Sequence, residues 1–176
     1  MKELINLARE TIKCRFRGDE LRISNEIKKK YSKKAACFVT LTKNGELRGC
    51  IGSLKARQPL YQDVIENSLN AAFNDPRFIP LQEHELKDIK IEISVLSDIK
   101  KIEFTNEKDL LKKINKNMGI VLRKGFNYAT FLPQVWEEIN DKVKFLEYLS
   151  LKAGLDKDDW KKSEIGFYTV DKVKEE

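Results

Sequence analysis

The sequence contains no run of about 18 consecutive apolar residues, which is close to the length that a helix needs to cross a membrane. Its first twenty positions mix charged residues, such as Lys2, Glu3 and Lys13, with apolar ones, and no signal peptide has that composition. These absences argue against a membrane-spanning or exported chain. We therefore expect a soluble, cytoplasmic protein that has no membrane partner.

Cysteine and histidine are also scarce. The three cysteines, Cys14, Cys37 and Cys50, are an odd number without the spacing of a zinc site, and His84 is the one histidine. Neither a disulfide framework nor a zinc or iron site is indicated, although carboxylates could still hold a hard cation. A glycine-rich phosphate loop and the three-cysteine cluster of a radical-SAM enzyme are both missing. We expect no bound cofactor and no metal.

What is present is typical of one globular domain: 176 residues, of which 41% are hydrophobic and 35% charged. The net charge of +6 raises the question of nucleic acid, but 26 of the 34 basic residues are lysine, whereas base and phosphate recognition favours arginine. The densest basic run, 28–34, is either a solvated segment or a track for a phosphate backbone. No row of aromatic residues alternates with basic ones as a single-strand platform requires. RNA binding stays open as an alternative.

Hydrophobic periodicity predicts helices and strands that alternate without the regularity of βαβ units, which favours an α+β fold with an antiparallel or mixed sheet and flanking helices. The expected helices lie near 4–16, 59–73, 106–114 and 141–153, with a short helical turn near 83–86. The expected strands lie near 36–42, 47–52, 89–95, 119–124, 126–132 and 165–170, and residues 172–176 are expected to form a frayed tail.

The strongest local signal is a hairpin around Asn44-Gly45, because both residues tolerate a positive φ. A two-residue turn at this point pairs Thr42 with Leu47, Leu41 with Arg48, Val39 with Cys50 and Cys37 with Gly52. Arg48 and Cys50 then share one face with Val39 and Leu41. Both faces are apolar, so the two strands are expected in the interior of a sheet.

Five blocks of the sequence, in order along nearly the whole chain, resemble the AMMECR family. They are Phe38-Val39-Thr40-Leu41 with Leu47-Arg48-Gly49-Cys50-Ile51-Gly52-Ser53-Leu54; Ala71-Ala72-Phe73-Asn74-Asp75-Pro76-Arg77-Phe78 with Pro80-Leu81; Ile93-Ser94-Val95-Leu96-Ser97; Leu132-Pro133-Gln134-Val135; and Lys152-Ala153-Gly154-Leu155. The one departure within them is Ile79, where the family commonly has proline.

The resemblance implies a single AMMECR-type domain over residues 1–176, with two unequal lobes in one compact unit. It also implies a cleft between the lobes, lined by the Leu-Arg-Gly-Cys-Ile-Gly strand, and it implies no established reaction. Family members often occur beside, or fused to, Memo-type and radical-SAM-type proteins. This association suggests that those proteins are partners in a shared modification pathway.

The strand 47–52 is the candidate site. An arginine near a thiol favours the reactive thiolate, so Cys50 is the candidate nucleophile or redox thiol, with Arg48 as its electrostatic partner and anion ligand. Gly49 and Gly52 would let a ligand approach the backbone, and Arg77 and Gln134 are expected to face the same cleft. In the structural alternative Cys50 is a small buried apolar residue, the glycines allow tight packing, and Arg48 pairs with an acidic residue.

Two functions follow. In the first, a cleft around 47–52 binds an anionic small molecule or a nucleotide-like group, either for catalysis or as a component of a pathway. In the second, the chain is a non-catalytic adaptor that binds a protein or RNA. The sequence leaves open whether the chain is an enzyme.

Overall fold

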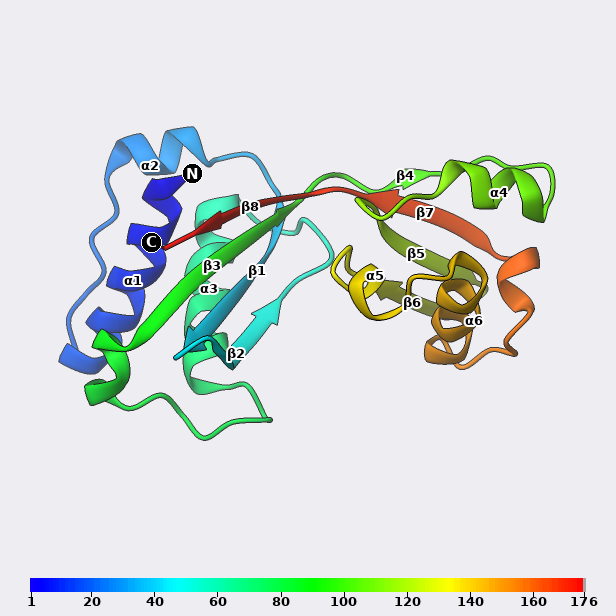
Figure 1. Ribbon diagram of the computed structural model, residues 1–176. Coiled ribbons are helices and arrows are strands. Elements are labelled where there is room, and N and C mark those ends of the chain that lie inside the picture. The colour runs from blue at the N-terminus through cyan, green and yellow to red at the C-terminus, as the bar shows by residue number, and fades with distance from the viewer. Residues whose placement is uncertain (176) are drawn as a thin grey trace. The chain divides into compact units, whose positions relative to one another are not determined.

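The computed structural model describes residues 1–175 of the chain, which form two antiparallel sheets of four strands each, together with six α-helices (Figure 1). The α+β class expected from the sequence is confirmed. The chain divides into two units: the first contains 1–96 and the C-terminal segment from Asp171, and the second contains 97–170. The second unit is therefore an insertion between the last two strands of the first.

The first unit contains a sheet in the strand order β2-β1-β3-β8, with the helices packed against it. Its elements are α1 (Lys2–Arg17), α2 (Asn25–Lys30), β1 (Ala36–Lys43), β2 (Glu46–Gly52), α3 (Leu60–Phe73), the 3-10 helix η1 (Glu83–Lys87), β3 (Ile89–Leu96) and β8 (Val170–Lys174).

One face of this sheet carries the core of the first unit. Alternate residues of β1 and β3, among them Val39, Leu41 and Ile93, are fully buried and pack in one cluster with Ala8 of α1 and Val64 of α3. The period of two in the strands and of about 3.6 in the helices brings these apolar positions together. α1 and α3 both contribute to this cluster, so they lie on the same face of the sheet. The strand residues that alternate with the buried ones point to the opposite face.

The hairpin register differs from the expected one beyond the turn. Thr42 faces Leu47 as predicted, but Leu41 then faces Gly49 and Thr40 faces Cys50, because Arg48 is an extra residue in a β-bulge. Since side chains alternate along a strand, this one-residue shift moves Cys50 to the opposite face. The expectation that Cys50 shares a face with Val39 and Leu41 is therefore wrong.

The bulge also lies on an edge. Among residues 1–175, β2 pairs with β1 alone, so the expectation of two interior strands is correct for β1 and wrong for β2. An edge strand presents unpaired N–H and C=O groups, which native proteins usually cover. In this protein the loop after α3 binds the edge N–H and C=O groups of Cys50, and that loop forms part of the candidate site.

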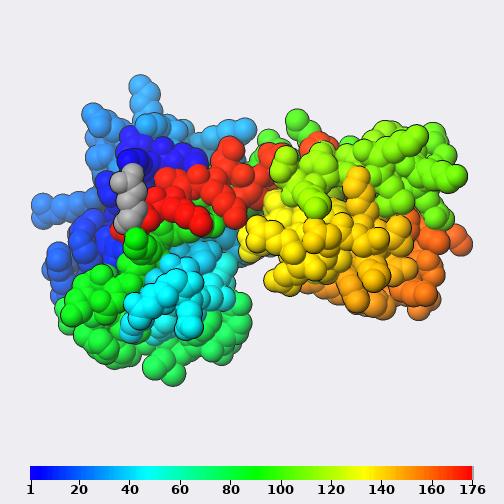
Figure 2. Space-filling view, in the orientation of Figure 1, coloured from blue at the N-terminus to red at the C-terminus, as the bar shows by residue number. Residues whose placement is uncertain are grey.

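The C-terminal segment is a strand and not the expected frayed tail. β8 lies beside β3, and in Figure 2 its red surface lies beside the blue surface of α1 within the first unit. Glu175 fixes its end: its backbone N–H donates to the Ile91 carbonyl at 2.9 Å, and its carboxylate accepts from Ile91 N–H and pairs with Arg9 of α1. Of the expected tail, residue 176 lies outside the described residues.

The second unit has its own sheet, in the order β4-β7-β5-β6, and its own hydrophobic core around Trp136, Phe145 and Trp160. Within residues 1–175 no helix is both long enough and apolar enough to span a bilayer. The elements of the second unit are β4 (Lys100–Lys101), α4 (Glu107–Lys113), β5 (Gly119–Lys124), β6 (Asn127–Phe131), α5 (Val135–Glu138), α6 (Lys142–Lys152), the 3-10 helix η2 (Asp159–Lys162) and β7 (Glu164–Tyr168).

Candidate functional site

Arg48 is committed to an ion pair. Its Nε and Nη2 atoms donate to the two carboxylate oxygens of Glu85 in η1 at 3.1 and 2.9 Å, and Lys43 Nζ donates to the same carboxylate at 2.9 Å. The Arg48 side chain is 12% exposed and that of Glu85 8%. The hydrogen bonds from Arg48 lower the pKa of Glu85 to about 2, against the opposing effect of burial. Arg48 thus holds η1 against the end of the sheet, as the structural alternative expects.

Cys50 lies beside a different arginine. The Cys50 N–H donates to Asp75 Oδ2 at 2.9 Å, and the Cys50 carbonyl accepts from Arg77 Nη2 at 3.1 Å. Both groups that the β2 edge presents at this residue are therefore satisfied by the loop that follows α3. The half-buried Cys50 thiol lies 3.2 Å from the Thr40 hydroxyl on the neighbouring strand.

The Asp75 carboxylate organises this loop. Arg77 donates to it from its backbone N–H at 3.1 Å, from Nε at 2.9 Å and from Nη2 at 2.7 Å. These donors, with the hydrogen bond of Arg77 first among them, hold the pKa of Asp75 well below its usual range in spite of burial. The Asp75 carboxylate in turn raises the pKa of Arg77, and the nearby Cys50 sulfur contributes in the same direction.

Asp75 and Arg77 differ in how far their side chains are buried. The Asp75 side chain is 2% exposed, whereas that of Arg77 is 53% exposed. The carboxylate is therefore a fixed internal anchor, and the guanidinium faces solvent with the donors that Asp75 and the Cys50 carbonyl do not use. Arg77 also lies 5.5 Å from the centre of the Phe78 ring, which further restricts its position.

The space beside Gly49 and Gly52 is occupied by other atoms of the protein. A Cβ on Gly49 would lie 2.1 Å from the Ala71 carbonyl oxygen of α3, so only glycine allows the helix to pack this closely on β2. A Cβ on Gly52 would lie 2.3 Å from the Phe38 ring. Both absent side chains thus make room for neighbouring protein atoms.

A buried network next to the site was not anticipated from the sequence. Asp63 of α3 accepts hydrogen bonds from the Cys37 N–H at 2.8 Å, from the Ser53 hydroxyl at 2.8 Å and from the Asn67 amide at 3.0 Å. Burial, followed by the nearby Asp63 carboxylate, raises the pKa of the Cys37 thiol. This network connects the end of β2 to α3, the helix that packs against Gly49.

Gln134, the last sequence candidate, and His84, the one histidine, lie elsewhere. Gln134 lies directly before α5 in the second unit, so its approach to Cys50 and Arg77 stays a prediction. His84 is exposed in η1, between Glu83 and Glu85. In the part of the chain that the structure describes, no group of three or more His, Cys, Asp or Glu side chains is arranged to hold a metal ion.

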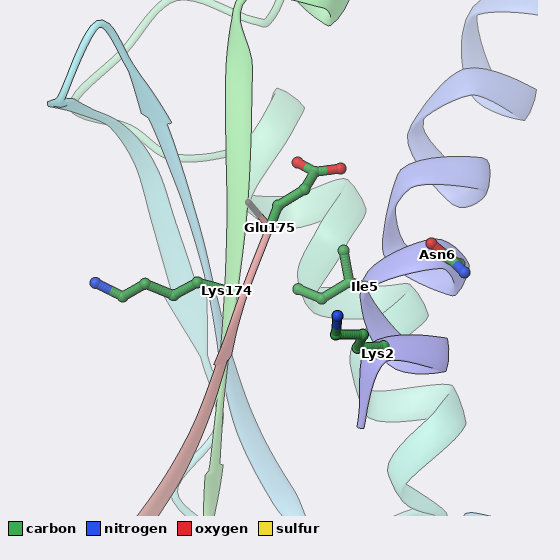
Figure 3. A pocket seen from close by; sticks show the side chains of 5 residues that line it. All are labelled: Lys2, Ile5, Asn6, Lys174 and Glu175. Carbon is green, nitrogen blue, oxygen red and sulfur yellow. The ribbon is translucent and has the colours of Figure 1, made fainter.

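A shallow pocket of about 150 Å³ lies between α1 and β8 in the first unit (Figure 3). Lys2, Ile5 and Asn6 line it from α1, Lys174 lines it from the end of β8, and Glu175 from the residue that follows. Figure 3 shows the Lys174 and Asn6 side chains pointing away from Ile5 in opposite directions. Because these polar groups do not converge, the pocket lacks the arrangement of a specific binding site.

The fold and the site define an α+β protein of two units, in which an edge strand with two packing glycines is closed by an Asp-Pro-Arg loop. The chain belongs to the AMMECR1 family, whose model matches residues 5–173. The resemblance recognised in the sequence is therefore confirmed.

Individual relatives span almost the same length. Protein NEQ441 of Nanoarchaeum equitans is 40% identical over 160 residues, which are 89% of each chain. A protein of Aquifex aeolicus is 38% identical over 172 residues, which are 96% of this chain and 88% of the relative. The crystal structure of the uncharacterized protein PH0010 from Pyrococcus horikoshii has a TM-score of 0.84 and 31% sequence identity, and the match covers 98% of this chain and 90% of that one.

The residues that the sequence interpretation missed are the acidic partners, Asp63, Asp75 and Glu85. Only Asp75 gave a local signal, since an aspartate two residues before an arginine can form a turn through its side chain. Glu85 lies 37 residues from Arg48 along the chain, and Asp63 lies 26 residues from Cys37. No spacing rule connects positions so far apart.

Proposed function

We propose that this chain binds an anionic small molecule at the edge of its first sheet, with Arg77 as the anion-binding group and Cys50 and Thr40 beside it. The observation that carries the proposal is the Arg77 side chain, which is 53% exposed and whose guanidinium is held in place by a buried carboxylate. A guanidinium is suited to carboxylate and phosphate because its planar donors match their oxygens. Its fixed position lowers the entropy cost of binding.

The polar environment of the site supports the proposal. The Asp75 oxygens are occupied by donors from Cys50 and Arg77, so the group turned to solvent is the cation and not the carboxylate. The Cys50 thiol and the Thr40 hydroxyl are hydrogen-bonded to each other, so one of them donates within the pair and the other can donate to the ligand. In this proposal Arg48, Gly49 and Gly52 shape the strand and do not contact the ligand.

The family resemblance extends the proposal to a pathway. A chain that binds an anionic intermediate and works with Memo-type and radical-SAM-type partners would present its ligand for modification by another protein. Catalysis by Cys50 itself is the stronger form of the proposal, and it requires the thiol to react with the bound ligand. The competing function is an adaptor whose Asp75–Arg77 loop does no more than close a sheet edge.

A binding measurement separates these functions. Pyrophosphate serves as the probe, and isothermal titration calorimetry gives its affinity for wild-type protein, Arg77→Ala, Arg77→Lys and the control Arg22→Ala, which changes an exposed arginine of the same unit. We expect Arg77→Ala to weaken binding by at least about tenfold, because charged hydrogen bonds contribute on the order of 1.5–3 kcal/mol. We expect Arg77→Lys to lie in between and Arg22→Ala to match wild type.

Thermal unfolding of each variant, measured alongside, checks that the loop still closes the sheet edge. Wild-type protein that does not bind pyrophosphate, or Arg77→Ala that binds it as tightly as wild type, would leave the adaptor as the better account.

A further inference from the structure

Phe38 occupies an unusual place on the sheet. It lies in β1, between Gly52 of β2 and Ser94 of β3, on the face opposite the buried Val39. Its ring is half-buried, yet it packs into neither of the two hydrophobic cores formed by the described residues. On this face the ring lies between the polar pair Thr40–Glu92 and the buried apolar pair Ala36–Leu96.

Gly52 keeps the ring in that place. A Cβ at position 52 would lie 2.3 Å from Cγ and 2.4 Å from Cδ1 of Phe38, so the ring extends across the strand where a side chain would otherwise stand. A ring held against a strand in this way has one side covered by backbone. Because the ring is half-buried, part of its surface is open to a second planar group.

The ring and the anion-binding group are a short distance apart. Cys50, whose carbonyl binds Arg77, and Gly52 are two residues apart on one strand and face the same side, so their positions are separated by about 7 Å along the strand. Thr40 and Phe38 have the same separation on β1. One small ligand can therefore reach both the guanidinium and the ring.

We propose that the ligand of this site is a nucleotide, with its phosphate on Arg77 and its base stacked on Phe38. The inference rests on the proposed function, because it takes Arg77 as the anion-binding group and adds the class of molecule. Bases of every kind stack on aromatic side chains, and arginine is a preferred partner of phosphate.

The residues between these two contacts fit the sugar. Thr40 faces both Cys50 and Glu92 across the sheet, so a hydroxyl and a carboxylate lie side by side on this face. Glu92 is 18% exposed and is held by Lys174 at 2.9 Å. Figure 3 shows that the Lys174 side chain points to the side of β8 away from α1. Phe38 lies on the face of Glu92, the partner of Lys174, because Phe38 is two residues from Thr40, which faces Glu92. A hydroxyl and a carboxylate can both accept hydrogen bonds from ribose hydroxyls.

The test compares AMP with ribose 5-phosphate, which has the same phosphate and sugar and no base. Calorimetry on the full chain is expected to show that AMP binds at least about tenfold more tightly, since stacking one base is worth roughly 1–3 kcal/mol. Phe38→Leu is expected to abolish this preference without changing the affinity for ribose 5-phosphate, and Phe38→Tyr to keep it. Phe126→Leu, at a fully exposed phenylalanine of the second unit, is the matched control and is expected to keep the preference.

Each outcome separates the inference from the proposed function. Equal affinities for AMP and ribose 5-phosphate, or a preference that survives in Phe38→Leu, would overturn the nucleotide assignment even if pyrophosphate still binds through Arg77. A protein that binds none of the three phosphate compounds would overturn both. Thermal unfolding of Phe38→Leu and Phe38→Tyr shows whether a loss of preference comes from a loss of fold.

Discussion

Gly49 and Cys50 are neighbours with opposite surroundings. Gly49 faces α3 and leaves no room for a side chain, whereas Cys50 faces the polar side of the sheet next to Thr40. Neighbouring residues of a strand face opposite sides, and the bulge at Arg48 decides that Gly49, and not Cys50, faces α3. One side of β2 therefore packs against α3, and the other side carries the Cys50 thiol.

The close approach at Gly49 gives the first prediction. Gly49→Ala should lower the free energy of unfolding by about 1–3 kcal/mol, because its Cβ would meet a helix carbonyl that cannot rotate away. Gly18→Ala is the control, since Gly18 has φ 72° and nothing within 4 Å, so the cost there is backbone strain of about 1 kcal/mol. Denaturant unfolding measures both variants. A Gly49→Ala no less stable than Gly18→Ala would contradict the packing role.

The ion pair of Arg48 gives the second prediction. The pKa of Glu85 is lowered from 4.5 to about 2 in the folded protein, so the stability that this carboxylate contributes is present above pH 4.5 and is lost as the pH falls to about 2. Wild type should therefore lose stability, on the order of 2 kcal/mol from this group, over that range.

Chemical denaturation as a function of pH measures this loss, and Glu85→Gln should have a flatter profile. Glu83→Gln, at an exposed position of the same turn, is the control and should follow wild type. If Glu85→Gln and wild type lose stability in parallel, the Arg48 ion pair does not contribute as described.

At the scale of elements, the sequence predicted what depends on neighbours in the chain. Alternation from Ile89 to Val95 marked β3, and the turn residues Asn44 and Gly45 have the positive φ values, 53° and 84°, that their types favour. No residue pattern predicts the bulge, because residues 49–52 alternate between the two faces in both the expected and the observed register. The face of Cys50 was therefore wrong, although the strand itself was right.

The C-terminal strand shows the same limit. Residues 172–174 are part of a short, charged segment, which is typical of a frayed tail. They form a strand because they lie beside β3, about 80 residues earlier in the chain. The contacts of Glu175 with Arg9 and Ile91 are also distant in sequence. Local patterns contain no information on such pairings.

These distant contacts give the third prediction. Glu175→Gln should lower the free energy of unfolding by about 1–3 kcal/mol, because Arg9 is 15% exposed and would lose its charged partner. It should also speed hydrogen exchange in β8. Glu10→Gln is the control, because the Glu10–Lys13 pair is exposed and should change stability by less than about 0.5 kcal/mol. Equal stabilities of the two variants would show that β8 is held by other contacts.

At the scale of the whole molecule, the second unit is an insertion with adjacent ends. The Ser97 N–H donates to the Thr169 carbonyl at 2.9 Å, and the Thr169 N–H donates to the Ser97 hydroxyl at 2.9 Å. The unit has its own core, in which the Trp136 and Phe145 rings are stacked with centroids 3.6 Å apart. A segment with joined ends and its own core meets the conditions for independent folding.

The fourth prediction is that residues 97–170 fold alone. Circular dichroism of this fragment should show a cooperative thermal transition, whereas fragment 1–96, which lacks β8 and Glu175, should unfold at a lower temperature than the same unit in the full chain. A 97–170 fragment without a cooperative transition would mean that its core is completed by other parts of the chain.

We propose that Arg77 and Cys50 form one anion-binding site, and protection of the thiol is the most direct test. Iodoacetamide labels wild-type protein and Arg77→Ala at constant pH, with and without pyrophosphate, and peptide mass spectrometry gives the rate at each cysteine. Cys14, half-buried in α1, is the internal control, and the buried Cys37 should stay unlabelled. We predict that pyrophosphate slows labelling of Cys50 in wild type alone and leaves Cys14 unchanged. Labelling of Cys50 at the same rate with and without pyrophosphate would contradict the account.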